Sequence, residues 1–402
     1  MRFWLLVAAT FCGFLGVGTV LPEIGPHVRH NLGGSDQTVG FAIGIFSIIA
    51  LGSRFFSGPL ADRRGRKIAF LTGLVSIAFS GASYLLPFGI SGIFLGRILQ
   101  GFGEACLYTG AAAWTVEVAG IERSAQALGY LSSGIWGGIS AGPMVGQWLG
   151  TFERAAILQV AAAITGFLLL KWVPEDYQPA HHKRRHWIPP SLIAPGLAVG
   201  FVSVQYPVVA GFLILHLARY GNSGPMAFTA YAGLILLSRF FLGGLPDRIH
   251  PQFTFYGGSI LMACGLIAIG AGPSRAVAIG AAALLGFGFS FPWSSIASTV
   301  LRETPERERG SAVGVLSAFY DLFVGLSSFA AGEISNRFGY GPAFFMAAAS
   351  LIGASAAAWF VFRARDRIAE ESAPVALSNR SVTLSAQYQD SEPRRSLSGL
   401  ED

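Results

Sequence analysis

The stretch SRFFSGPLADRRGRK, residues 53–67, returns in altered form as SRFFLGGLPDRIH, residues 238–250. The two copies align at an offset of 185 residues, and the same offset aligns Gly101-Phe102-Gly103 with Gly286-Phe287-Gly288. Because the match holds over two separate segments, it indicates that the chain is built from two related halves.

The sequence around both copies is too apolar for a water-soluble protein. Asp, Glu, Lys and Arg make up 12% of the chain and hydrophobic residues 52%, whereas a soluble domain has roughly 25% charged residues. The charges separate apolar runs of about 20 residues, the length that a helix needs to cross the hydrocarbon core. They predict an all-α membrane protein with twelve transmembrane helices, at residues 3–22, 36–58, 68–87, 91–116, 124–149, 154–173, 191–216, 225–245, 253–272, 274–299, 309–333 and 340–362.

A polar segment divides the two halves. Residues 174–190, PEDYQPAHHKRRHWIPP, are bounded by prolines and predict a cytoplasmic linker between six-helix bundles at residues 1–173 and 191–362. Residues 363–402 are rich in Ser, Arg, Glu and Asp and predict a disordered cytoplasmic tail.

Lys and Arg in the loops predict the orientation. If the N-terminus is inside, the inner loops hold most of the basic residues, among them Arg63, Arg64, Lys67 and Lys183. Cytoplasmic loops retain positive charge, so both termini are expected in the cytoplasm. The net charge of +6 then needs no nucleic-acid partner. Three histidines of the linker lie beside a basic run, which favours a solvated segment over a metal site, so no metal is expected. No cofactor is expected either.

The segment Gly58–Lys67 resembles the signature G-x-L-a-D-r-x-G-r-k of the major facilitator superfamily, in the loop where that family has it. The resemblance covers the chain except its tail. It implies two six-helix bundles, a monomer in the lipid bilayer, and alternating access for a small-molecule substrate.

The resemblance also assigns gate residues. It implies that Asp62 approaches a helix of the other half near Gly310, that Gly65 permits the reversal, and that Arg66 pairs with Glu117. The second copy keeps Asp247 and Arg248 but lacks the following glycine and basic pair, so a weaker latch is implied there. The alternative is that these charges merely mark a positive loop.

Arg54 and Arg239 precede Asp62 and Asp247 by eight residues, about 12 Å deeper along each helix. A charge at that depth needs a cavity or a partner. Because the pair is duplicated, a shared structural role at the gates is favoured over substrate contact.

The fourth run resembles the family's conserved fourth-helix motif and has a polar stripe. Arg97, Gln100, Glu104 and Tyr108 share one helical face, which is expected to line the aqueous cavity. Arg97 could stabilise a carboxylate on another helix. Glu104 and Asp321 lie near the middle of their spans and are the candidate proton carriers, since burial favours the neutral form of a carboxyl group. A fixed ion pair with an arginine is the open alternative.

Glycines in the fifth run resemble the antiporter motif of the superfamily, which is associated with efflux. The matching positions are Gly129, Gly138, Gly142, Pro143 and Gly146, and the pattern departs where Gln147 replaces a final glycine. Generic packing of small residues is the competing interpretation. Further side chains are expected to line a substrate cavity, namely Trp136, Gln205, Tyr206, Trp293 and Tyr320.

Within the superfamily the chain is most similar to the twelve-helix drug:H+ antiporters, which include bacterial multidrug and sugar efflux permeases. The likeness rests on residues 286–292, GFGFSFP, with Arg309-Gly310 and Phe319-Tyr320-Asp321. It implies proton-driven export of a small organic molecule or drug across a bacterial inner membrane, with no enzymatic activity. Separately from the resemblance, the 32 phenylalanines and the few charges expected in the cavity favour amphipathic compounds, including cationic ones, as cargo.

The alternatives differ in class. An uptake symporter on the same fold is the nearest, and a transporter-like sensor would need an output domain larger than the polar tail. An ATP-driven pump is disfavoured because the sequence has no G-x-x-x-x-G-K-[ST] loop.

Overall fold

The computed structural model is a bundle of membrane-length helices. It describes residues 2–119, 124–175, 189–221, 223–242, 249–305 and 309–363. Within these ranges the chain is helical apart from short turns and contains no strand. Ten helical segments are long and apolar enough to cross a membrane, and α5 and α6, of 31 and 26 residues, bring the long segments to twelve. The predicted all-α fold of twelve spans is confirmed.

The first six spans follow the predicted runs closely. They comprise α1 (Arg2–Thr19), α2 (Leu21–Pro26) and η1 (His27–Asn31), then α3 (Asp36–Arg64), α4 (Arg66–Leu85), α5 (Gly89–Ala119), α6 (Ser124–Leu149) and α7 (Phe152–Lys171). The main difference is that the first span continues to Asn31 instead of ending at residue 22.

The second six spans have the same general plan. They comprise η3 (Pro190–Leu192), α8 (Ile193–Ser203) and α9 (Gln205–Leu217), then α10 (Gly224–Leu242), α12 (Pro251–Gly270), α13 (Arg275–Phe289), α14 (Pro292–Glu303), α15 (Arg309–Phe338) and a C-terminal helix, Tyr340–Arg363. The predicted linker and tail fall almost entirely outside the described residues, so those boundaries stay predictions.

Prolines explain why some spans are interrupted. Pro22 and Pro207, which correspond at the 185-residue offset, follow the breaks between α1 and α2 and between α8 and α9. A proline has no N–H for the carbonyl four residues earlier, and at these breaks the chain makes tighter bonds, such as Val204 N–H to Phe201 O at 3.4 Å. Pro292 similarly begins α14, whereas its counterpart Leu107 lies inside the unbroken α5.

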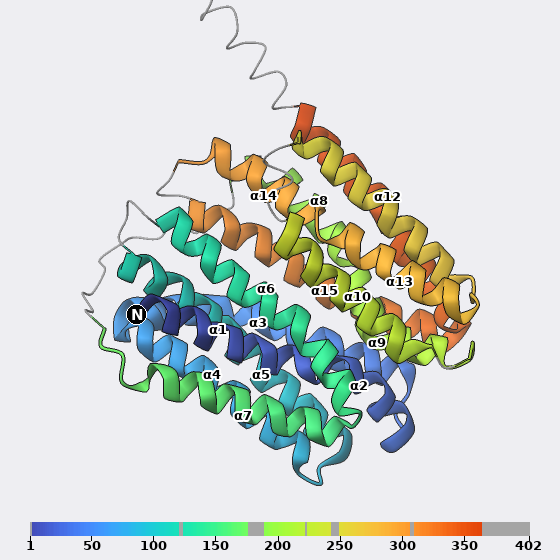
Figure 1. Cartoon of the computed structure of the whole chain (residues 1–402), viewed down its shortest axis with the longest axis horizontal. Coiled ribbons are helices and arrows are strands. Elements are labelled where there is room, and N and C mark those ends of the chain that lie inside the picture. Colours follow the sequence, from blue (N-terminus) through green and yellow to red (C-terminus); the bar gives the residue numbers. More distant parts are fainter. Residues whose placement is uncertain are drawn as a thin grey trace, which may run out of the picture.

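Each half packs mainly within itself, and the halves meet along a few helices (Figure 1). The blue-to-green helices α1–α7 lie together, and the helices from α8 to the red C-terminal helix lie beside them. Across the boundary α3 packs along α15 and α6 along α10. Glycines bring the backbones close there: a Cβ on Gly44 would lie 3.0 Å from the Gly325 carbonyl oxygen, and one on Gly40 would lie 2.8 Å from Gly332 Cα.

The outer surface of the bundle is apolar. Phe55 and Trp148, for example, are 75% and 84% exposed. A surface of this kind is suited to lipid, and it leaves the buried charges described below between the helices.

Candidate functional site

A buried ion pair joins the two halves. Arg54 of α3 donates from Nη2 and Nε to Asp321 Oδ2 of α15, at 2.7 and 3.1 Å. The side chains are only 18% and 14% exposed, and the Arg54 guanidinium lies 5.1 Å from the centre of the Tyr108 ring. The ion pair with an arginine that was the alternative for Asp321 is therefore present, although the sequence did not indicate that Arg54 is the partner.

Glu104 of α5 shares this charge cluster. Its carboxyl group interacts electrostatically with both Arg54 and Asp321. Its Oε2 atom is buried without a hydrogen-bond partner. Two carboxyl groups thus interact with one guanidinium, and among the described residues only Asp321 forms an ion pair with it.

Arg97 has a different environment from the one expected. It is 2% exposed and donates to the carbonyl oxygens of Ala42 at 2.8 Å and Ile43 at 3.4 Å, and to the Gln100 side chain. The expectation that Arg97 stabilises a carboxylate is not met in this structure. The backbone of α3 and the Gln100 side chain accept hydrogen bonds from Arg97, and it is Arg54 that pairs with an acid.

The counterpart of Arg54 lies among aromatic rings. The Arg239 guanidinium of α10 is 3.8 Å from the ring centre of Trp136 in α6 and 6.0 Å from that of Phe289 in α13. Its Nε is buried without a hydrogen-bond partner. Arg54 and Arg239 both reach across the boundary between the halves, but their partners differ in chemistry.

A pocket lies between the halves, and the empty space in it, counted together with the part that is open to solvent, is about 410 Å³. Trp136 and Tyr206 line it, together with Phe228, Tyr231 and Phe289. Two amides expected to line the cavity are instead fully buried: Gln100 bonds to Gln159 at 3.1 Å, and Gln205 bonds to the Tyr231 hydroxyl at 3.1 Å.

The remaining predicted cavity residues lie near these groups. Trp293 packs edge-on against both Trp136 and Tyr320, at ring-centre separations of 6.3 and 5.8 Å. Tyr108 packs under Arg54 in the ion cluster. The predicted residues therefore divide between an ionic cluster, an aromatic cavity and a buried amide network.

The loop between α3 and α4 is held by contacts with the end of α5 and with residues 171–175 that follow α7. Gly65 has φ +112°, where only glycine is unstrained, and Arg66 forms an ion pair with Glu117 at the end of α5. The Arg66 N–H also donates to Glu175 at 2.5 Å, and Lys67 donates to the Val173 carbonyl at 2.6 Å.

Other parts of the predicted gate are not described. The expected contact of Asp62 near Gly310 involves side chains outside the described set and stays a prediction. Asp247 and Arg248 also lie outside the described residues.

The glycines of α6 divide into two groups. Gly138, Gly142 and Gly146 face α1, where a Cβ on Gly142 would lie 2.7 Å from Gly18 Cα. Pro143, which lies inside α6, packs against Gly18 as well: a Cβ on Gly18 would lie 3.1 Å from the Pro143 Cδ atom. Gly129 has open space around it and takes no part in this contact.

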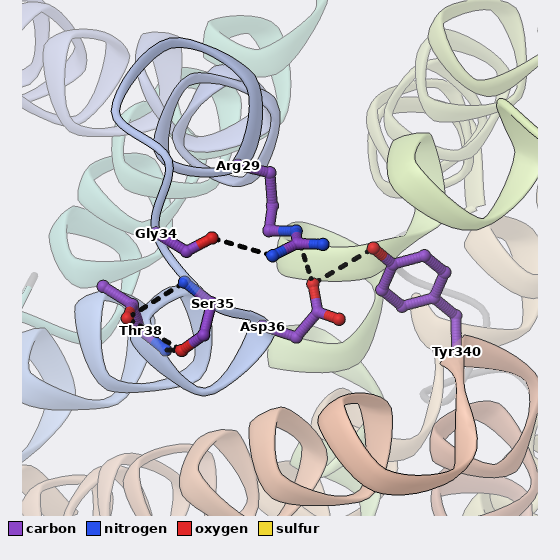
Figure 2. Close-up of polar contacts among 6 residues, drawn as sticks. All are labelled: Arg29, Gly34, Ser35, Asp36, Thr38 and Tyr340. Carbon is purple, nitrogen blue, oxygen red and sulfur yellow. Dashed lines mark hydrogen bonds and ion pairs between the residues drawn. The ribbon is translucent and has the colours of Figure 1, made fainter.

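A polar cluster that the sequence did not predict links the halves at one end of the molecule (Figure 2). Arg29 pairs with Asp36 Oδ1 at 3.0 Å and donates to the Gly34 carbonyl at 2.8 Å, while Tyr340 from the second half donates to Asp36 at 3.0 Å. Ser35 and Thr38 cap the start of α3 reciprocally. The Ser-x-x-Thr pattern could have predicted the start of α3, but nothing in the sequence indicates that Tyr340 is the partner of Asp36.

Twelve long helices in two related sets, with a cavity and buried charges between them, define a multi-pass membrane protein of the transporter class. The model of the Major Facilitator Superfamily matches residues 6–328 and 222–387, and the chain belongs to this family of transporters, which are not enzymes.

Individual relatives and solved structures are similar to the chain over most of its length. An uncharacterised MFS-type transporter of Salmonella typhimurium is 28% identical over 366 residues, covering 87% of this chain and 93% of the relative. The crystal structure of a D-xylose-proton symporter has a TM-score of 0.75 at 16% identity, covering 90% and 97% of the two chains. That of a nucleoside transporter has a TM-score of 0.74 at 12% identity, covering 90% and 100%. The structural likeness shows a shared fold.

Proposed function

We propose that this transporter is a proton-coupled antiporter that exports a small organic molecule from the cytoplasm by alternating access. The observation that carries the proposal is the cluster of Arg54, Asp321 and Glu104 at the boundary between the halves. A proton bound there can influence how the halves associate.

Charge balance suggests how coupling works. One guanidinium compensates one carboxylate, and a second uncompensated carboxylate in a low-dielectric interior is strongly unfavourable. A proton on Glu104 or Asp321 brings the cluster to neutrality. When the site opens to the outside it takes up a proton and releases substrate, and when it opens to the cytoplasm it releases the proton and binds substrate.

The direction rests on the helix contact between α1 and α6. Gly138, Gly142 and Gly146 support a close, well-defined packing of these helices, in the pattern that resembles the antiporter motif. Both termini in the cytoplasm, a bacterial inner membrane, and a gate formed by Asp62, Arg66 and Glu117 belong to the same proposal.

Inverted membrane vesicles with an acidic lumen test the proposal. A panel of dyes, antibiotics, sugars and organic acids is added outside, and a pH-sensitive dye reports the lumen. If the protein is an antiporter, at least one compound makes the lumen more alkaline. If no compound changes the pH of the lumen, proton coupling is refuted.

Variants locate the proton site. Glu104→Gln and Asp321→Asn are expected to abolish substrate-induced alkalinisation, each removing one carboxyl group from the cluster. Glu333→Gln is the control, since Glu333 pairs with Arg337 on a partly exposed stretch of α15 and is expected to retain coupling. Full coupling in both cluster variants would remove the site from the mechanism.

A further inference from the structure

The two arginines of the repeat have partners that correspond at the same 185-residue offset. Asp321 corresponds to Trp136, and Glu104 corresponds to Phe289. Arg54 faces the two acids, and Arg239 faces the two aromatic residues. One arginine site of the duplicated fold is therefore ionic, whereas at the other site no acid among the described residues pairs with the arginine.

Arg239 has an incompletely satisfied charge. It makes no hydrogen bond and no ion pair with any part of the chain that the structure describes. Stacking on Trp136 compensates part of the cost of burial, but a ring face cannot accept the N–H bonds that a guanidinium donates in a plane. Arg239 is not itself in the wall of the aromatic cavity, but the two rings that it contacts, Trp136 and Phe289, are.

We propose that Arg239 anchors the anionic group of the transported molecule, and that the substrates are organic carboxylates with a planar apolar body. A carboxylate matches the fork of a guanidinium, while Tyr206, Tyr231 and Trp136 provide ring surfaces for the apolar part. A cationic cargo would bring a second positive charge to Arg239. Because of this unpaired guanidinium, we expect anionic substrates instead of the cationic compounds that the composition of the chain favoured. This assignment rests on the proposed function, because it names the substrate of the same transporter.

The test is equilibrium binding to the full chain in lipid nanodiscs, measured by calorimetry without a proton gradient. The probes are acetate, benzoate and indole-3-acetate, the neutral amides of the same acids, and benzylammonium. At least one acid is expected to bind about 10- to 100-fold more tightly than its amide, since the amide has no negative charge and only one acceptor oxygen for the guanidinium. Absence of binding by every acid, or equal binding of acid and amide, would overturn the proposal.

Variants assign the effect to one residue. Arg239→Gln is expected to lower the affinity for the acid to that for the amide. Arg239→Lys keeps the positive charge but not the two parallel donors of the guanidinium, and its affinity for the acid is expected to lie between those of the unaltered protein and Arg239→Gln. Arg275→Gln, at an exposed arginine on α13 that contacts Met226, is the control and is expected to bind as the unaltered protein does. Retention of acid affinity in Arg239→Gln would contradict the assignment, and binding of the amide by this variant verifies its fold.

The experiments separate the two proposals. Anion binding through Arg239 without proton movement in vesicles would leave the anion site standing and refute antiport. Alkalinisation by neutral or cationic compounds that is unchanged in Arg239→Gln would leave antiport standing and refute the anion site.

Discussion

Arg54 and Arg97 are both largely buried charges of the first half, yet they are held by different partners. Arg97 is satisfied by carbonyl oxygens of α3 and by Gln100, all within its own half. Arg54 is satisfied by Asp321 of the second half. Arg97 therefore stabilises one bundle, whereas the bond of Arg54 must change whenever the bundles separate.

The pair of Arg54 and Asp321 makes a testable prediction about stability. Arg54→Gln leaves buried carboxyl groups without a counter-ion and is expected to lower the free energy of unfolding by about 3–5 kcal/mol. The double variant Arg54→Gln with Asp321→Asn is expected to lose less free energy of unfolding than Arg54→Gln alone, because neither position then carries an unpaired charge. Unfolding by SDS in mixed micelles measures both. Additive losses in the double variant would show that the residues are not coupled.

The sequence located the charges of the site but not all of their partners. Glu104 and Asp321 stand out because a carboxyl group within an apolar run is rare. The partners of Arg97 are backbone carbonyls, which have no sequence signature. The contact of Arg239 with Trp136 follows from the 185-residue offset only when the pair of Arg54 and Asp321 is already known, because Trp136 corresponds to Asp321.

At the scale of helices, the contact between α1 and α6 depends on the absence of side chains. A Cβ on Gly142 would lie 2.7 Å from Gly18 Cα and 2.8 Å from the Leu15 carbonyl oxygen. These are backbone atoms, which cannot rotate away. The neighbouring Gly138 and Gly146 meet the same surface one turn before and after.

Alanine substitutions in α6 test this contact. Gly142→Ala is expected to lower the free energy of unfolding by about 1–3 kcal/mol through overpacking. Gly129→Ala has open space at its Cβ and is expected to be neutral or to stabilise by up to about 1 kcal/mol through helix propensity. SDS unfolding distinguishes the two, and equal losses at both positions would contradict the role of the contact.

Helix limits were predictable where hydropathy changes sharply. The fifth run was predicted at 124–149 and α6 spans Ser124–Leu149. The first span was predicted too short because His27, Arg29 and His30 read as a loop. The helix continues through them because Arg29 finds Asp36 and Gly34 as partners, and these contacts exist only after the chain has folded.

Across the whole molecule, the two halves are joined at one end by Asp36 and Tyr340 (Figure 2). Arg219 of the second half lies 5.0 Å from the centre of the Tyr340 ring. This end cluster adds a polar bond to the apolar contacts that join α3 and α15 nearby, among them the rings of Phe41 and Phe329, whose centres are 4.9 Å apart. It is expected to bias the equilibrium between conformations that are closed and open at this end.

Tyr340→Phe removes only the hydroxyl of this cluster. A hydrogen bond to a charged group contributes about 1.5–3 kcal/mol, so the ratio of open to closed molecules is expected to rise about 10- to 100-fold. Spin labels at the exposed positions His30 and Asn336, with the native cysteines replaced, report the separation. Tyr256→Phe is the control, because its hydroxyl bonds to Ser355 inside the second half. An unchanged distance distribution in Tyr340→Phe would show that the bond does not bias the equilibrium.

The glycine contact of α3 with α15 has a mechanical consequence. Gly40 and Gly44 touch α15 near one end of α3, and Arg54 lies fourteen residues beyond Gly40 on the same rigid helix. With α3 as a lever arm of about 21 Å and the glycines as its fulcrum, a rotation of about 10° would separate Arg54 from Asp321 by about 4 Å. That gap admits a water molecule, about 2.8 Å across. A small tilt of one bundle is thus enough to hydrate the ion pair and expose its carboxyl groups to protons.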